Sequence, residues 1–397
     1  MKIIGDREAA VEILKTTANL EKVKVLSNII ISTDYVQQIY DQLIQSNVTS
    51  PQDFLWQSQL RYYWEEENLV LRMIETSLMY GYEYLGSYER LVMTELTLKC
   101  YRVLTVALQQ IKGGSVEGPT GTGKSETVKD LAKACGKQCI VFNCSEGLDY
   151  RPLGKFIKGL ACSGAWSCFD EFHRVKGSVL SIVSQDILTL QRGIQAQLAS
   201  IILDDTEIVL NPTCAIYITM ESLSTLPLKI PDNFRVLFRS IAMMNPNAMI
   251  ITQVCLSSKG FVNAHILARK VTSMFSICQN TLSKQPHYEF GLRSIKSVID
   301  LSIKFKHENQ EADETGIIFN AFYRLKFSEL LPEDQKIFLE IAADIFPQTE
   351  VSRPAYEAID EAISSVCENL YLDCNDYFRS KVHQLYEMIR ELLDFFS

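Results

Sequence analysis

The chain has 397 residues, of which 47% are hydrophobic and 22% charged, and its formal net charge is −9. Since this length exceeds the usual size of one hydrophobic core, we expect about two or three packed units of an ordinary globular protein. The negative charge argues against nucleic acid as a partner, because binding to a phosphate backbone needs a basic surface. No apolar run approaches the ~20 residues that span a bilayer, so we expect no membrane partner.

The eleven cysteines are scattered through apolar stretches, which favours free thiols in a reducing compartment over a disulfide framework. The first ten residues, MKIIGDREAA, do not have the pattern of a signal peptide. Cys135 and Cys139 form no CxxC pair, and the five histidines lie far apart in the sequence. We therefore expect no structural zinc site.

The first part of the chain has the pattern of helices. Apolar residues three and four positions apart predict helical structure from about Val11 to Met79, including a stretch rich in tyrosine and tryptophan. A short strand is predicted over Arg90–Thr94. A helix is predicted over 95–114, closed by the glycine pair at its end.

Strands and helices then alternate, which predicts a parallel sheet covered by helices on both faces. Strands are expected at 115–118, 138–145, 165–172 and 213–220, helices at 124–136, 153–164 and 177–198, and a hairpin at 200–210 with Asp204 and Asp205 near its turn. Beyond about Asn245 we expect helices alone. In the last of them Val382, Leu385, Ile389 and Leu392 share one face.

A glycine-rich loop stands between a predicted strand and a predicted helix. It fits the phosphate-loop pattern G-x-x-x-x-G-K-[ST] with Gly118, Pro119, Thr120, Gly121, Thr122, Gly123, Lys124 and Ser125, and Glu126 adjoins it. Glycines let backbone N–H groups point at phosphate oxygens, and the helix N-terminus attracts the same anion. Lys124 would reach the β- and γ-phosphates and Ser125 would bind Mg²⁺. The alternative is a chance glycine-rich turn.

Two carboxylates end the predicted strand AWSCFDEF. Phosphoryl transfer to water needs a carboxylate in the magnesium shell and often a second one that orients the attacking water. We assign Asp170 to the metal and Glu171 to the water. The alternative is that both residues merely end a strand and face solvent.

The stretch from Gly118 to Phe172 resembles the first AAA+ module of a dynein heavy chain. The resemblance covers roughly residues 50 to 347, through strings such as QLRYYWEEENLVLRMIETSLMYGYEYLG, IPDNFRVLFRSIAMMNPNAMII and HYEFGLRSIKSVI; ILTLQRGI and LNPTCA are more similar to axonemal, inner-arm chains. It implies an α/β AAA+ P-loop NTPase with a parallel-sheet core, followed by a small all-helical lid domain. The implied parts are 1–78 (a helical segment resembling the end of the linker), 79–246 (large α/β subdomain), 247–330 (helical lid) and 331–397 (helical start of a following, truncated module).

The resemblance also implies ATP or ADP and Mg²⁺ as ligands, other dynein modules or chains as partners, and contact with microtubules only indirectly, through regions outside this sequence. It implies the cytoplasm, cytoskeleton and ciliary axoneme as the location. Lys124 and Glu171 match catalytic positions of the family, and Arg293 matches its second sensor, although a surface ion pair is the alternative. Arg239 matches an arginine offered to a neighbouring module. Leu91, Val92 and Met93 fall where adenine packs, or are plain core.

The sequence departs from the family after the fourth core strand. Glu221 replaces the asparagine of the first sensor, and Ser222 replaces a proline. Replacing the asparagine amide by a carboxylate removes a hydrogen-bond donor and adds repulsion of a triphosphate on the order of several kcal/mol. Hydrolysis is therefore expected to be weak. An arginine of the next module, worth orders of magnitude in rate, is also expected to be missing. The alternatives are a non-hydrolysing, nucleotide-dependent scaffold of a dynein-like assembly, or a truncated product that folds poorly.

Overall fold

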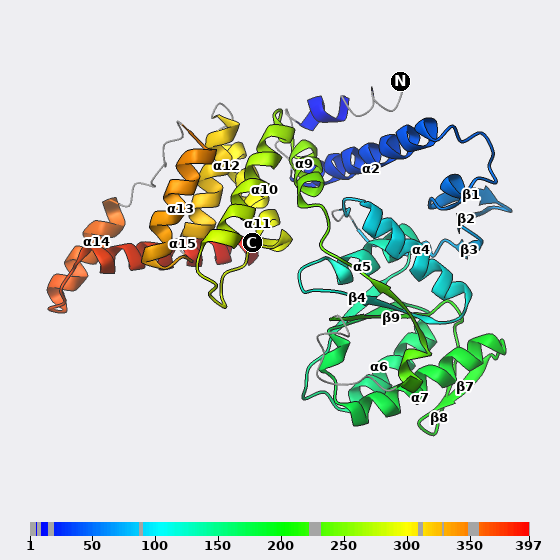
Figure 1. Ribbon diagram of the computed structural model, residues 1–397. Helices are drawn as coiled ribbons and strands as arrows, with labels where there is room; N and C mark the ends of the chain where they lie inside the picture. The colour runs from blue at the N-terminus through cyan, green and yellow to red at the C-terminus, as the bar shows by residue number, and fades with distance from the viewer. Residues whose placement is uncertain are drawn as a thin grey trace. The chain divides into compact units, whose positions relative to one another are not determined.

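The computed structural model describes residues 5, 9–14, 20–86, 90–221, 232–308, 313–327, 329–347 and 357–396 (Figure 1). The chain divides into two compact units. The first comprises Met1–Arg269 with Gly291–Arg293, and the second comprises Lys270–Phe290 with Ser294–Ser397.

A five-stranded sheet forms the centre of the first unit. Its strands are β4 (Gly113–Glu117), β5 (Cys139–Asn143), β6 (Trp166–Asp170), β9 (Ala215–Met220) and β10 (Phe238–Ala242). The spatial order is β10-β4-β9-β6-β5, and every neighbouring pair is parallel. The predicted parallel sheet is confirmed. Because parallel strands end at one edge of the sheet, the residues that follow β4, β6 and β9 gather at that edge.

Helices cover both faces of this sheet (Figure 1). They are α4 (Glu95–Gln109) and α5 (Lys124–Ala134) on one side, and α6 (Tyr150–Ser163) and α7 (Gly177–Gln195) on the other. Strand β9 shows the alternation of a sheet buried on both faces. Ile216 and Ile218 belong to the cluster under α6 and α7, whereas Tyr217 between them belongs to the cluster under α4 and α5.

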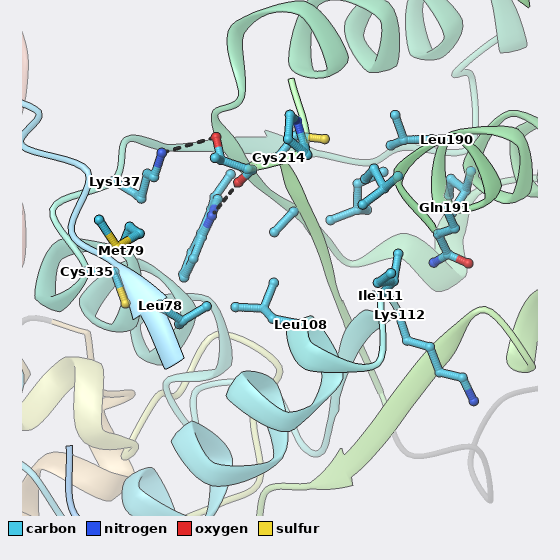
Figure 2. A pocket seen from close by; sticks show the side chains of 18 of the residues that line it. Leu78, Met79, Leu108, Ile111, Lys112, Cys135, Lys137, Leu190, Gln191 and Cys214 are labelled. Atoms are coloured by element: carbon cyan, nitrogen blue, oxygen red, sulfur yellow. Dashed lines mark hydrogen bonds between the residues drawn. The ribbon is translucent and has the colours of Figure 1, made fainter. Parts of the chain in front are cut away.

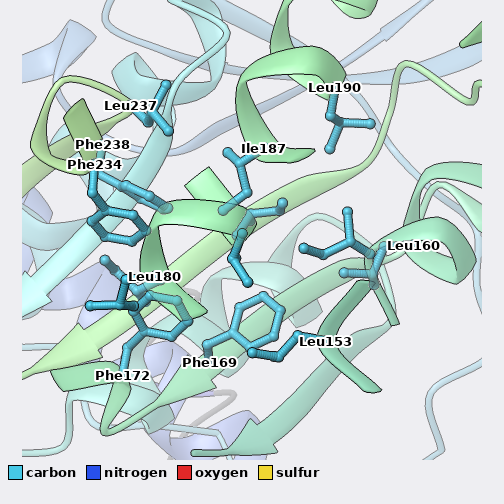
Figure 3. Close-up of a cluster of buried hydrophobic side chains, with 14 of the residues drawn as sticks. Leu153, Leu160, Phe169, Phe172, Leu180, Ile187, Leu190, Phe234, Leu237 and Phe238 are labelled. Atoms are coloured by element: carbon cyan, nitrogen blue, oxygen red, sulfur yellow. The ribbon is translucent and has the colours of Figure 1, made fainter. Parts of the chain in front are cut away.

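The cluster under α6 and α7 is rich in aromatic rings (Figure 3). The ring of Phe234 stacks on that of Phe172 at 5.2 Å and on that of Phe238 at 4.7 Å between centroids. Phe169 of β6 packs edge-on against Phe172 at 5.6 Å. These contacts attach the turn after β6 to the short helix α8 (Asp232–Arg235) and to β10. The strand β10 itself is absent from the sequence-based prediction.

The glycine pair Gly113–Gly114 does not cap a helix, so that prediction is wrong. Helix α4 already ends at Gln109, and the left-handed residue after it is Ile111, with φ 54°. The glycines open β4 instead. A Cβ on Gly113 would lie 2.4 Å from the ring of Phe238, and one on Gly114 would lie 2.3 Å from Leu104. Close packing of the strand against β10 and α4 is therefore what requires glycine here.

The N-terminal region is helical only in part. Residues 9–14 are helical, and the helices α2 (Leu20–Gln45) and α3 (Phe54–Gln57) follow. The predicted helical structure is wrong over 61–79, where β1 (Arg61–Glu65), β2 (Asn68–Met73) and β3 (Thr76–Met79) form an antiparallel sheet. Glu66 and Glu67 make the first turn with φ of 46° and 63°. Two left-handed residues close a tight hairpin, and this turn overrides the helical periodicity.

The structure contradicts the strand expected before α4 and confirms the hairpin expected after α7. Residues 90–94 form no strand: Thr94 is the N-cap of α4, and its side chain accepts a hydrogen bond from the Thr97 N–H. The predicted hairpin is confirmed as β7 (Ser200–Leu203) and β8 (Thr206–Val209). Asp204 and Asp205 form its turn with φ of 43° and 57°, which are the values of a type I′ turn.

The described residues after β10 form helices and connecting turns and no strand, as predicted. The helices are α9 (Ala248–Ser258), α10 (Ala264–Thr281), α11 (Leu292–Glu308), α12 (Glu314–Phe322) with a π-helical continuation Tyr323–Phe327, α13 (Pro332–Ile345), α14 (Glu357–Asn369) and α15 (Asp376–Phe396). Phe322 joins the core of the second unit, 4.8 Å from Phe275 and 5.6 Å from Phe338 between ring centroids. The side chains of Leu385 and Ile389 on α15 are exposed. Among the described residues no helix is long and apolar enough to cross a membrane.

Candidate nucleotide-binding site

The glycine-rich loop connects β4 to α5 at the carboxyl edge of the sheet. Gly121 and Gly123 have φ of 79° and 88°, a region that side chains disfavour. A Cβ on Gly118 would lie 2.0 Å from the carbonyl oxygen of Met243, so this position also requires glycine. The Thr122 hydroxyl donates to the Pro119 carbonyl at 3.0 Å and closes the turn. The predicted strand–loop–helix context is confirmed.

Lys124 is the first residue of α5, and its ammonium group points back into the loop. Nζ donates to the carbonyl oxygens of Gly118 at 2.8 Å and Pro119 at 2.7 Å. Burial lowers the pKa of Lys124, while the carboxylates of Asp170, Glu221 and Glu171 oppose the shift. Phosphate oxygens are stronger acceptors than these carbonyls, because the hydrogen bond is then assisted by charge on both sides.

Asp170 ends β6 and faces the start of α5. Its Oδ1 accepts hydrogen bonds from the Ser125 hydroxyl at 2.5 Å and from the Thr219 hydroxyl of β9. Serine and aspartate oxygens at a phosphate loop are the ligand types that Mg²⁺ prefers. The donor set therefore fits this metal, with Ser125 and Asp170 as the residues that would hold it. Among the described residues, no group of three or more His, Cys, Asp or Glu side chains is placed to bind a metal ion.

Thr219 is a functional residue that the sequence analysis missed. Besides donating to Asp170, its hydroxyl oxygen accepts the backbone N–H of Glu171 at 3.1 Å. The side chain is fully buried in the strand AIYITM. A buried hydroxyl among apolar neighbours needs partners, so a threonine inside a buried strand was the available signal. It orients the Asp170 carboxylate and holds the backbone of Glu171.

Glu171 has a left-handed backbone with φ 53°, which is uncommon outside glycine and often marks a functional site. Its carboxylate pairs with Arg174 Nε at 2.8 Å. The two side chains are half-exposed. In this conformation Arg174 competes with a water molecule for the carboxylate, and catalytic groups commonly realign once substrate is bound.

Glu221 follows β9 and lies at the same edge. Its backbone N–H donates to Nδ1 of His173 at 3.4 Å. Burial lowers the pKa of His173; the carboxylates of Glu221 and Glu171 oppose the shift, and the cations of Arg174 and Lys124 add to it. In the sequence, His173 is one of five histidines that lie far apart. Its place three residues after Asp170 was the signal that could have drawn it to the site. Ser222 lies outside the described residues.

The segment before α4 is fastened to α5 by a buried carboxylate, Asp130. Asp130 accepts the Leu91 N–H at 3.2 Å and the Tyr101 hydroxyl at 2.6 Å, and lies 3.2 Å from Arg90 Nε. Since α5 begins in the phosphate loop, Asp130 ties residues 90–91 to the loop. Val92 is buried in a cluster with Ile31 and Val254, and Leu91 is half-buried. Their role against adenine stays a prediction.

Three further residues were predicted to act on a nucleotide: Glu126, Arg239 and Arg293. Glu126 is exposed and pairs with Lys129 at 2.7 Å. Arg239 is exposed on β10 and donates to Gln110 Oε1 at 3.1 Å. Arg293 is the second residue of α11. Their assignments to a nucleotide of this chain or of a neighbouring module stay predictions.

A separate cavity of about 260 Å³ lies at the opposite, amino-terminal edge of the sheet (Figure 2). Gly113, Trp166 and Ala215, each the first residue of its strand, line it together with apolar residues of α4 and α7. The Trp166 indole donates to the Thr213 carbonyl at 3.2 Å, and Lys137 donates to the Thr213 hydroxyl at 3.2 Å. Because the phosphate loop follows the other ends of the strands, this cavity does not belong to the nucleotide site.

A family model described as the hydrolytic ATP binding site of dynein motor region matches residues 80–393. The chain belongs to this dynein family. It is 44% identical to mouse dynein axonemal heavy chain 3 over 355 residues. The matched region covers 89% of this chain and 9% of that protein. It is 44% identical over 363 residues to human dynein axonemal heavy chain 1 (91% and 8%) and 42% identical over 359 residues to human dynein axonemal heavy chain 12 (89% and 12%).

The dynein relatives confirm the expected family, and the parallel sheet followed by helices confirms the AAA+ fold class. This chain spans only 8% to 12% of the length of the three relatives named.

Proposed function

We propose that this chain is the Mg-ATP-binding AAA+ module of an axonemal dynein heavy chain. The observation that carries the proposal is the geometry around Asp170: its Oδ1 joins Ser125 of the phosphate loop to Thr219 of the neighbouring strand. The relatives' names support the ciliary axoneme and cytoskeleton as its location. In the complete motor, hydrolysis would be coupled to movement along microtubules, with other dynein modules as direct partners.

The residues of the site have distinct tasks in this proposal. The N–H groups of the loop and of the first turn of α5 bind the phosphates, and Lys124 exchanges its two carbonyl acceptors for phosphate oxygens. Ser125 and Asp170 would hold Mg²⁺, which would neutralise charge on the phosphates. Glu171 orients the attacking water once its carboxylate leaves Arg174.

A non-hydrolysing scaffold is the second candidate, and two observations favour it. The Glu171 carboxylate is occupied by Arg174, and a carboxylate stands at position 221 near Lys124. Either feature would slow the attack of water while leaving the phosphate loop able to bind ATP. Nucleotide would then lock the module for assembly with other chains.

Phosphate release at saturating Mg-ATP separates the two functions. The parent chain is compared with Lys124→Ala, Glu171→Gln and Glu221→Asn variants, and ATP binding is followed in parallel by thermal shift. If the parent chain releases phosphate and both Lys124→Ala and Glu171→Gln abolish this release, the result supports the ATPase. A thermal shift without release supports the scaffold, and release gained by Glu221→Asn identifies the carboxylate as its cause. Absence of any thermal shift with Mg-ATP contradicts both functions.

A further inference from the structure

His173 lies at the candidate nucleotide site and takes no part in the proposed function as described above. It belongs to the short 3₁₀ turn Phe172–Arg174 that follows the Asp170–Glu171 pair. Its ring contacts the backbone of Glu221, 48 residues further along the chain. The charges that act on it are those of the site itself: Glu221, Glu171, Arg174 and Lys124.

The contact with Glu221 defines which ring nitrogen carries the proton. Nδ1 accepts the Glu221 N–H at 3.4 Å, so Nδ1 has no hydrogen. A neutral imidazole with an unprotonated Nδ1 carries its hydrogen on Nε2. Burial, which lowers the pKa of this ring, favours the neutral form at physiological pH. His173 therefore offers one N–H donor, at Nε2, in addition to the acceptor that is already in use.

The side chain beside it, Glu221, is a carboxylate at the edge of the sheet where the phosphate loop begins. Glu221 follows the strand β9, which lies between the strands carrying the phosphate loop and Asp170. A carboxylate group accepts hydrogen bonds from donors, and its negative charge would repel a terminal phosphate. The neutral imidazole held against its backbone is a donor of suitable type at this place in the fold.

We propose that His173 donates its Nε2–H to the terminal phosphate of bound ATP and so replaces the donor that Glu221 cannot provide. This inference rests on the proposed function, because it presumes that the loop binds ATP. It makes His173 a sensor of the γ-phosphate, which ADP lacks. The effect should appear in binding, as a preference for ATP over ADP, before any hydrolysis is considered.

Two conservative variants of the full chain separate the two ring nitrogens. In His173→Asn the amide oxygen takes the place of Nδ1, so the contact with Glu221 is kept and the Nε2 donor is lost. In His173→Gln the amide nitrogen reaches the place of Nε2, so the donor is kept. Dissociation constants for ATP and ADP are measured by competition with a fluorescent nucleotide, with and without Mg²⁺. A hydrogen bond to a charged acceptor predicts an about tenfold loss of ATP preference in His173→Asn and near-parental preference in His173→Gln.

The controls keep the inference and the proposed function apart. His265→Ala removes an exposed histidine of α10 and should leave both dissociation constants unchanged. Equal ATP preference in the parent and His173→Asn, or a loss confined to His173→Gln, overturns the γ-phosphate contact while ATP binding stands. A parent that binds neither nucleotide overturns the proposed function, and the inference with it. Melting temperatures without nucleotide report any purely structural effect, which would weaken ATP and ADP binding equally.

Discussion

Asp186 of α7 is a buried carboxylate whose removal should stabilise the protein. It is 8% exposed and lies across Gly154 of α6 from the hairpin turn. A Cβ on Gly154 would be 3.0 Å from Asp204 Oδ2 and 3.9 Å from Asp186 Oδ2, so the two carboxylates converge on one point. Burial raises the pKa of Asp186 from 3.8 to about 6; the Asp204 carboxylate raises it further and Lys158, which pairs with Asp204 at 3.3 Å, opposes the shift.

The magnitude follows from the linkage between protonation and folding. The folded pKa exceeds the unfolded value by about two units, and each unit corresponds to about 1.4 kcal/mol. Above pH 6 the folded state must hold the ionised form, which the unfolded state holds at no cost. Asp186→Asn should therefore stabilise the protein by about 3 kcal/mol at pH 7.5. As the pH falls through 6 the folded state takes up the proton, and about half of the gain should remain at pH 5.

Urea unfolding followed by circular dichroism at pH 7.5, 6 and 5 measures this gain. Asp205→Asn is the matched control, because Asp205 is exposed and adjoins Asp204 in the hairpin turn. It should change the free energy of unfolding by less than about 0.5 kcal/mol at each pH. A loss of stability in Asp186→Asn at pH 7.5, or a gain that does not shrink towards pH 5, would refute the reasoning. Either result would mean that Asp186 is held by favourable contacts in its ionised form.

Three further substitutions test the site. Gly118→Ala places a Cβ 2.0 Å from a backbone carbonyl oxygen and should abolish the thermal shift with Mg-ATP, whereas Gly147→Ala, with open space around it, should keep that shift. Thr219→Val removes the hydroxyl that bonds the Asp170 carboxylate and the Glu171 backbone N–H. Urea unfolding should show a loss of about 1–3 kcal/mol, and calorimetry should show a weaker Mg²⁺ dependence of ATP binding. Tyr101→Phe deletes a hydrogen bond to the buried Asp130 carboxylate and should cost about 1.5–3 kcal/mol in urea unfolding; an unchanged midpoint would show that this bond contributes no net stability.

The phosphate loop and the Asp170–Glu171 pair were predictable from the sequence because each depends on neighbouring residues. A loop of fixed spacing binds phosphate through its own backbone and the next helix, so Gly118–Ser125 carries its meaning locally. Alternating apolar stretches likewise predict a parallel sheet, and residues that follow parallel strands gather at one edge. Sequence alone therefore determined the fold class, and it predicted the place of the candidate site and its two carboxylates.

The remaining features depend on contacts between distant segments. Residues 61–79 have apolar spacing compatible with a helix, and pairing between three strands decides against it. Thr219 and His173 each meet their partners across 48 or 49 residues, so no local pattern joins them to Asp170 or Glu221. Only the tertiary structure decided these partnerships. The reason is physical: the order β10-β4-β9-β6-β5 inserts β9 between β4 and β6, and that insertion brings a hydroxyl and the Glu221 backbone to the carboxylates.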